Sequence, residues 1–252
     1  MGAVAGGGRH LIDRWSPADG VGRVLVVTAH PDDVDFGAAG TVCAFTDAGI
    51  EVAYCIVTDG DAGGDDPAVS RADMASIRRE EQLAAAAVVG VHDVTFLAYP
   101  DGRVVPSLEL RRDLTRVIRR LRPGRVVTQS PDRMWGRIYA SHPDHLAVGE
   151  AATCAVYPDA RNPFAHPELL AEGLEPHFVP ELWLMATASP TIAVETTHTF
   201  DRKIEALRCH RSQVGDAGEL DARLRQWASA SARDAGLPED TLAEAFLRVN
   251  TA

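Results

Sequence analysis

Two short segments of the sequence combine histidine and aspartate at close spacing. The first is HPDD at residues 30–33, and the second is HPDH at residues 142–145. Neutral imidazole nitrogens and carboxylate oxygens form zinc sites in proteins, and a catalytic zinc needs three protein ligands and one open position. The two segments together hold more of these groups than three ligands require. The surplus could supply a general acid or base and a group that stabilises an oxyanion.

The position of these segments along the chain favours a shared site. Residues 30–33 directly follow an apolar, β-branched run at 23–29, and residues 142–145 follow a second such run at 125–128 after a loop. Ligands of open α/β sheets bind at the carboxyl ends of the strands. The simpler interpretation of the first segment is that Asp32 or Asp33 caps the next helix. The segment lacks the GxGxxG spacing of a dinucleotide site, which argues against a nicotinamide enzyme.

The elements needed to position these residues alternate along the chain. This alternation predicts one α/β domain over residues 1–252, with a Rossmann-like, mostly parallel sheet, helices on both faces and a helical C-terminal part. The Gly-rich N-terminus predicts a loose arm over residues 1–20, and the Pro-rich stretch 158–180 predicts an irregular excursion. The predicted strands are 23–29, 51–58, 94–97, 125–128, 182–187 and 193–197; the predicted helices are 37–48, 70–89, 108–121, 142–156, 200–209 and 222–247.

Composition narrows the classes of partner. The chain has 252 residues and a formal net charge of −11, so it carries no overall basic signal for nucleic acid and no polybasic membrane patch. No segment approaches the roughly 20 apolar residues of a membrane anchor, and the N-terminus does not resemble a signal peptide. The four cysteines are widely spaced, which predicts reduced thiols in a cytoplasmic protein. A homo-oligomer is compatible with the sequence, which does not indicate one.

Four segments resemble the PIG-L/LmbE-type N-deacetylase family. Two contain the His/Asp clusters: TAHPDDVDFGAAGTV at 28–42 and HPDHLAVGEAA at 142–152. The third is IRREE at 77–81 with the following AAAAVVGVHDVTFLAYPDG, and the fourth is KIEALRCHRSQ at 203–213. They occur in the order typical of the family. In the fourth segment we expect His210 to be structural and to pack beneath the site.

The resemblance implies a Rossmann-like fold and a mononuclear zinc hydrolase. Such an enzyme removes acetyl, or occasionally other acyl, groups from the amine of small N-acetylglucosamine-type sugars or conjugates. Carried over by position, His30, Asp33 and His145 match the metal ligands, and Asp32 matches the general base for the attacking water. Asp35 stands where many members have glutamate.

Three further roles follow from the same resemblance. His142 matches the residue that stabilises the tetrahedral oxyanion, Asp144 the acid that orients His142, and Arg78 a substrate-contacting arginine. The alternative for Arg78 is a surface ion pair with Glu81 one helical turn away. Two other functions stay open from the residues: a metal-dependent phosphoesterase, because such clusters also bind two metals, and a non-catalytic sugar-binding protein of the same fold.

Overall fold

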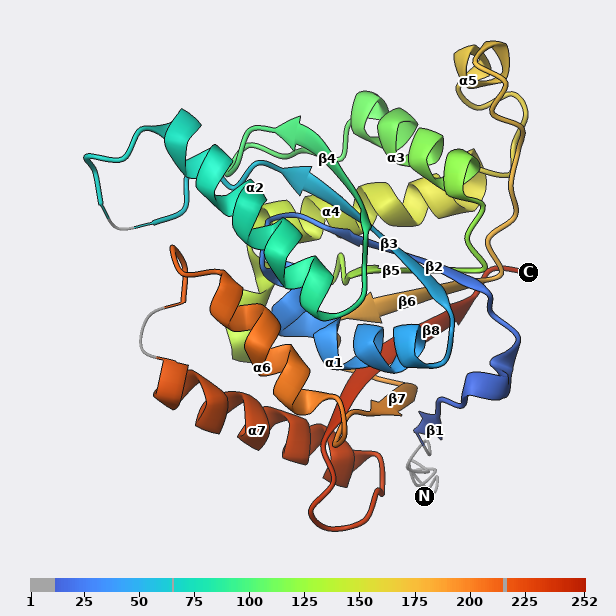
Figure 1. Cartoon of the computed structure of the whole chain (residues 1–252). Helices are drawn as coiled ribbons and strands as arrows, with labels where there is room; N and C mark the ends of the chain where they lie inside the picture. The colour runs from blue at the N-terminus through green and yellow to red at the C-terminus, as the bar shows by residue number, and fades with distance from the viewer. Residues whose placement is uncertain (1–11, 65, 215–216) are drawn as a thin grey trace, which may run out of the picture.

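A computed structural model describes residues 12–64, 66–214 and 217–252. Its centre is a sheet of eight strands in the order β1-β7-β8-β6-β5-β2-β3-β4 (Figure 1). Neighbouring strands are parallel, except that β8 is antiparallel to both β6 and β7. The strands are β1 (Asp13–Arg14), β2 (Arg23–Thr28), β3 (Glu51–Thr58), β4 (Asp93–Tyr99), β5 (Arg125–Gln129), β6 (Glu181–Met185), β7 (Ile192–Glu195) and β8 (Ala243–Asn250).

Helices cover both faces of this sheet, as the sequence predicts. Side chains alternate between the two faces of a strand, so Val24 and Val26 of β2 join a core with α1, α2 and α6, while Leu25 and Val27 join a core with α3 and α4. Helix α7 packs on α6 over a smaller third core. The helices are α1 (Asp33–Asp47), α2 (Arg71–Val88), α3 (Leu108–Leu121), α4 (Pro143–Cys154), α5 (Pro167–Ala171), α6 (Phe200–Cys209) and α7 (Ala217–Asp234).

The strand order reverses beside β2. The chain passes from β2 to β3 and β4 on one side and then returns to β5 on the other side of β2. This order is that of doubly wound dinucleotide-binding sheets, whose ligands lie at the carboxyl ends of the strands where the order reverses. Residues 30–33 follow β2, and the 3-10 segment η2 (Trp135–Ser141) with α4 follows β5. The topology therefore brings both His/Asp clusters to one edge of the sheet.

Two sequence predictions are wrong at the ends of the chain. The predicted helix 222–247 ends at Asp234, and β8 follows it. Gly236 has φ +65°, the left-handed conformation that ends many helices, and Pro238 cannot continue a helix. Residues 13–19 do not form a loose arm, because β1 pairs with β7 and a 3-10 turn follows; residues 1–11 lie outside the described part.

Two other observations bear on the sequence predictions. All four cysteines are free thiols, in agreement with the predicted reduced state. Among the described residues, no helix has both the length and the apolar character that a bilayer span requires.

Helix α4 lies close against the end of β5. A Cβ placed on Gly149 would lie 2.4 Å from the carbonyl oxygen of Gln129 and 2.9 Å from the main-chain nitrogen of Pro131. Both are main-chain atoms, which cannot swing away as a side chain could. Gly149 therefore sets how closely α4, with the histidines at its start, approaches the sheet.

We expect Gly149→Ala to destabilise the protein. Overpacking typically costs about 1–3 kcal/mol of unfolding free energy, which corresponds to a fall in Tm of roughly 2–12 °C for a chain of this size. The matched control is Gly22→Ala, where a Cβ would meet nothing within 4 Å. Thermal unfolding followed by circular dichroism measures both variants. Equal Tm values for the two would contradict the close approach.

Candidate active site

The imidazole of His30 lies between three carboxylates. Its Nε2 is 3.1 Å from Asp101 Oδ1 and 3.2 Å from Asp144 Oδ2, and its Nδ1 is 3.3 Å from Asp33 Oδ2. The His30 side chain is only 10% exposed. A carboxylate oxygen accepts hydrogen bonds, so Nε2 carries the proton shared by Asp101 and Asp144. The other ring nitrogen, Nδ1, faces Asp33.

The carboxylate of Asp144 is held by main-chain donors that follow β4. It accepts from the N–H of Gly102 (2.8 Å) and of Val104 (3.2 Å). The expectation that this carboxylate orients His142 is wrong, because its side-chain partner is His30. The main-chain N–H of Asp144 instead donates to Nδ1 of His142 at 3.2 Å, as α4 begins at Pro143. Asp144 thus orients one imidazole with its side chain and another with its backbone.

Three imidazoles and Asp33 converge at this edge of the sheet. One ring nitrogen from each of His30, His142 and His145 lies within 4.8 Å of the others. Nε2 of His145 is 3.0 Å from Asp33 Oδ1, while its Nδ1 lies 3.3 Å from the carbonyl oxygen of Ala140. A carbonyl accepts, so Nδ1 of His145 carries a proton, and Nε2 is the ring nitrogen that faces Asp33.

Asp32 and Asp33 are adjacent in sequence but have separate partners. Asp33 Oδ2 accepts from the main-chain N–H of His30 (2.7 Å) and from Nε2 of Gln129 (2.9 Å). The Asp32 carboxylate instead lies 3.2 Å from the guanidinium of Arg78. Asp32 has φ +92° and its side chain caps no helical N–H, so the capping interpretation is wrong for this residue.

Arg78 is buried behind Asp32. Its side chain is 4% exposed, and it also donates to the carbonyl oxygens of Pro31 (2.5 Å) and Gly60 (3.0 Å). The alternative of a surface pair with Glu81 is wrong, since Glu81 accepts from Ser212 instead. Contact of Arg78 with a substrate stays a prediction; the contacts within the chain hold Asp32.

Burial and neighbouring charges shift the pKa values of His30 and Asp33 in opposite directions. Burial alone would lower the pKa of His30, but Asp33, Asp101 and Asp144 raise it to about 12. Burial alone would raise the pKa of Asp33, but the facing His145 and His30 hold it well below the usual range. Without another cation, the carboxylates therefore draw positive charge onto the imidazoles.

The pKa values of the other two groups shift in opposite directions. Burial, and then the charge of Asp33, raise the pKa of Asp32 to about 7, although Arg78 opposes this shift. Burial and the two neighbouring imidazoles lower the pKa of His142. At neutral pH His142 is therefore uncharged. Because its Nδ1 accepts from Asp144 N–H, its proton sits on Nε2.

The donor set fits a divalent metal such as zinc. Asp32, Asp33, Asp101 and Asp144 bring four carboxylates into a mostly buried cluster that has one guanidinium, from Arg78. Two ring nitrogens, one on His30 and one on His145, also face the oxygens of Asp33, so a proton or a cation must lie between each nitrogen and its oxygen. Imidazole nitrogen and carboxylate oxygen are zinc ligands.

A second group of possible ligands lies on the opposite side of the same ring. His30, Asp101 and Asp144 also have donor atoms within 4.8 Å of one another. Asp144 already accepts main-chain hydrogen bonds from Gly102 and Val104. Asp101 accepts one from Ala62. This group is therefore better explained as carboxylates that orient His30, the usual arrangement around a metal-binding histidine.

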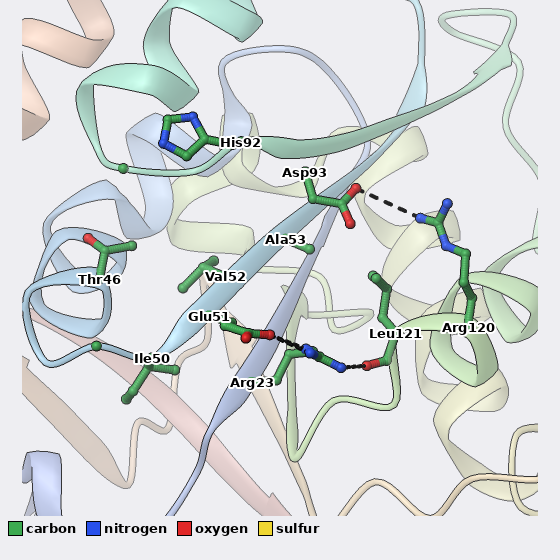
Figure 2. Close-up of a pocket in the computed structure, with 12 residues that line it drawn as sticks. Arg23, Thr46, Ile50, Glu51, Val52, Ala53, His92, Asp93, Arg120 and Leu121 are labelled. Atoms are coloured by element: carbon green, nitrogen blue, oxygen red, sulfur yellow. Dashed lines mark hydrogen bonds and ion pairs between the residues drawn. The ribbon is translucent and has the colours of Figure 1, made fainter.

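A cavity of about 480 Å³ lies away from this cluster (Figure 2). It is lined by Arg23, Glu51 and Asp93, which begin β2, β3 and β4, and by Arg120. The parallel strands place these residues at the amino edge of the sheet, opposite the histidines. None of the predicted site residues lines this cavity.

Sequence reasoning missed three residues that support the site. Asp101 contacts His30, and Gln129 donates to Asp33. Gln82 accepts from the main-chain N–H of Asp32 at 2.8 Å. Asp101 follows β4, Gln129 is the last residue of β5, and Gln82 lies within α2. A polar residue at a strand's carboxyl end is a signal for the first two. No local pattern marks Gln82.

The comparisons with known proteins point to one family. A family model described as PIG-L: GlcNAc-PI de-N-acetylase matches residues 25–156. The diacetylchitobiose deacetylase of Thermococcus kodakarensis is 35% identical over 201 residues, covering 78% of this chain and 72% of that protein. A protein of Bacillus anthracis described as probable N-acetyl-alpha-D-glucosaminyl L-malate deacetylase 2 is 31% identical, covering 76% of this chain and 81% of its own length.

A solved structure extends the similarity over most of the fold. The N,N'-diacetylchitobiose deacetylase from Pyrococcus horikoshii, complexed with its inhibitor MPG, superposes with a TM-score of 0.85 at 31% identity. The match covers 93% of this chain and 86% of that one. Fold and site thus define an α/β protein with a histidine–aspartate cluster where the strand order reverses. The chain belongs to the PIG-L family, whose relatives named above are deacetylases, enzymes that hydrolyse N-acetyl amides.

We expect Arg78→Met to destabilise the fold far more than Arg79→Met. Breaking a buried ion pair from one side typically costs about 3–5 kcal/mol, because the other charge is left without its partner. Arg79 is exposed and lies over the ring of Phe96, a contact worth about 1 kcal/mol or less. Urea denaturation measures both losses. Similar losses in the two variants would contradict the burial of Arg78 against Asp32.

Proposed function

We propose that this chain is a zinc-dependent N-deacetylase of small N-acetylglucosamine-type sugars or conjugates. The observation that carries the proposal is the placement of two ring nitrogens, from His30 and His145, against the two oxygens of Asp33, with Asp32 beside them. Membership of the PIG-L family and the names of the relatives support the reaction and the substrate class.

The proposed zinc ligands are His30 through Nδ1, His145 through Nε2, and Asp33. Zinc supplies a Lewis acid that polarises the amide carbonyl and makes water more acidic. The carboxylates of Asp101 and Asp144 fix the orientation of His30, and the carbonyl of Ala140 does the same for His145. We do not assign His142 as a ligand, because its Nε2 carries the proton.

Asp32 is the proposed general base. Its carboxylate is turned away from the partners of Asp33 and is held by Arg78, so it stays free of the ligand set. It accepts the proton of the attacking water and then delivers a proton to the nitrogen of the leaving amine.

His142 is the proposed oxyanion stabiliser. The backbone N–H of Asp144 occupies Nδ1, so Nε2–H is the donor that this ring presents to the site. A neutral, oriented N–H donor suits the negative charge that develops on the carbonyl oxygen during attack. Its lowered pKa keeps the ring neutral near pH 7.

The substrate class rests on the relatives. They are named for deacetylation of diacetylchitobiose and of an N-acetylglucosaminyl malate. An N-acetylated glucosamine unit is the group that these names share, and we propose it for this chain. No observation favours a phosphoesterase or a non-catalytic sugar-binding protein. A single domain and a cytoplasmic location stay predictions.

Acetate release tests the proposal. The zinc-loaded protein is incubated with N,N'-diacetylchitobiose, with an N-acetylglucosaminyl malate and with p-nitrophenyl phosphate. We expect acetate from at least one of the two sugars, detected by mass spectrometry as loss of one acetyl unit, and no phosphate. Release of phosphate, or no release of acetate from either sugar, would contradict it.

We expect Asp32→Asn to lose turnover while zinc stays bound. A positioned general base contributes about 10²–10⁴-fold to the rate, and the asparagine keeps the size of the side chain but accepts no proton. The matched control is Asp47→Asn at the other end of α1, where the exposed carboxylate pairs with Arg202. Turnover and zinc content are measured on both variants. Near wild-type turnover in Asp32→Asn would refute the base assignment.

A further inference from the structure

The main chain of Asp32 is held in a conformation that residues other than glycine rarely adopt. Its φ is +92° and its ψ is −30°, a strained combination that persists only where surrounding contacts impose it. Two side chains of α2 supply contacts: Arg78 bonds to the carboxylate, and Gln82, one turn further along, accepts from the main-chain N–H at 2.8 Å. Residues four apart share one face of a helix, so one face of α2 contacts Asp32 at both its carboxylate and its main-chain N–H.

The orientation of the Gln82 amide is determined by the next residue in a buried chain of hydrogen bonds. Nε2 of Gln82 donates to Asp35 Oδ2 at 3.0 Å. A main-chain N–H can only donate, so the amide oxygen faces Asp32 and the amide nitrogen faces Asp35. Gln82 and Asp35 are both fully buried. The contact with Asp32 therefore depends on Asp35.

Asp35 is in turn held from α6. Nε2 of His210 lies 2.8 Å from the same oxygen, Asp35 Oδ2, and His210 is also fully buried. Nδ1 of His210 has no hydrogen-bond partner in the described part of the chain. The chain of bonds thus runs from the end of α6 through α1 and α2 to the backbone of Asp32, and it explains why His210 lies beneath the site.

We infer that Gln82 is a positioning residue for Asp32 and that Asp35 and His210 set the direction in which its amide points. The inference deepens the proposed function, on which the role of Asp32 as base rests. With the N–H of Asp32 turned to Gln82, the Asp32 carboxylate points away from the partners of Asp33. Loss of this contact lets the backbone relax from positive φ and moves the carboxylate off the attacking water.

The donor and acceptor roles in the hydrogen bonds of residue 35 can be exchanged without changing the size of the side chains at positions 35 and 82. Gln82→Glu sets two carboxylates against each other, and their repulsion moves the acceptor oxygen of residue 82 away from the N–H of Asp32. Asp35→Asn alone still offers an acceptor oxygen to Gln82 and His210. In the double variant the amide introduced at position 35 has two hydrogens. One can go to the carboxylate introduced at position 82 and the other to Nε2 of His210, provided that the His210 proton moves to its free Nδ1. The double variant therefore restores the two bonds of residue 35 in the opposite direction, while the N–H of Asp32 still donates to residue 82.

The test compares turnover, KM, zinc content and the backbone of Asp32 in these variants. We expect Gln82→Glu to lower kcat by about 10- to 100-fold, the size of effect that follows a displacement of about 1 Å, with KM and zinc content near wild type. Asp35→Asn should have a small effect, and the double variant should recover most of the kcat. Crystal structures should show that Asp32 leaves positive φ in Gln82→Glu and returns to it in the double variant.

One control variant and one substitute test variant separate positioning from general stability. Thr46→Val removes a hydrogen bond from Thr46 to the carbonyl of Val89, which also links α1 to the end of α2 but far from Asp32; its kcat should stay near wild type. Gln82→Met removes the bonds without adding charge and replaces Gln82→Glu if that variant does not fold.

The outcomes also separate this inference from the proposed function. No acetate release by the wild-type protein overturns the proposed function, and the position of Asp32 in the crystal structures then decides the inference alone. An unchanged Asp32 backbone in Gln82→Glu and Gln82→Met, or an active wild type whose kcat neither variant lowers, would overturn it. A loss that the double variant does not recover would overturn the role of Asp35.

Discussion

Buried negative charge around the imidazole of His30 is the interaction on which the rest of the site depends. Carboxylates out of water are costly unless they are paired and hydrogen-bonded. Main-chain N–H groups and Arg78 compensate part of the charge, and the raised pKa of His30 shows how strongly the remainder favours a positive charge there. A divalent cation on the Asp33 side of the ring would meet the same need and would leave the imidazole in its neutral, ligating form.

The fold brings these groups together from distant parts of the chain. Four parallel strands, β2 to β5, end at one edge of the sheet, and the segment after each of them carries a group of the cluster or a group that holds it. Helices α1 and α4 both begin there, and Gly149 lets α4 lie close to the end of β5. Short connections from a rigid sheet can hold such groups in place better than mobile loops could.

Local pattern was enough to predict most of the fold. The strand at 51–58 and the helix at 108–121 have the predicted bounds, because β-branched runs and amphipathic spacing with clear breakers are local signals. β8 was missed because AEAFLRVN is compatible with a helix, and only its pairing between β6 and β7 makes it a strand. The breaker at 236–238 was the signal that the sequence did offer.

Prediction of the site was also limited by contacts between distant segments of the sequence. The residues that converge were evident from two motifs, but their partners were not, because hydrogen bonds between distant segments leave no local pattern. Asp144 illustrates this limit: its carboxylate faces His30, 114 residues away, rather than the neighbouring His142. Arg78 is a second case, since its partner is Asp32 rather than a residue one turn away on its own helix.

The position of the metal tests the central claim most directly. Crystals grown with zinc, measured on both sides of the zinc absorption edge, locate the ion without reference to activity. The account predicts one anomalous peak within bonding distance of His30 Nδ1, His145 Nε2 and the Asp33 carboxylate. A peak on the other side of the His30 ring, between Asp101 and Asp144, or no peak in this part of the structure, would contradict it.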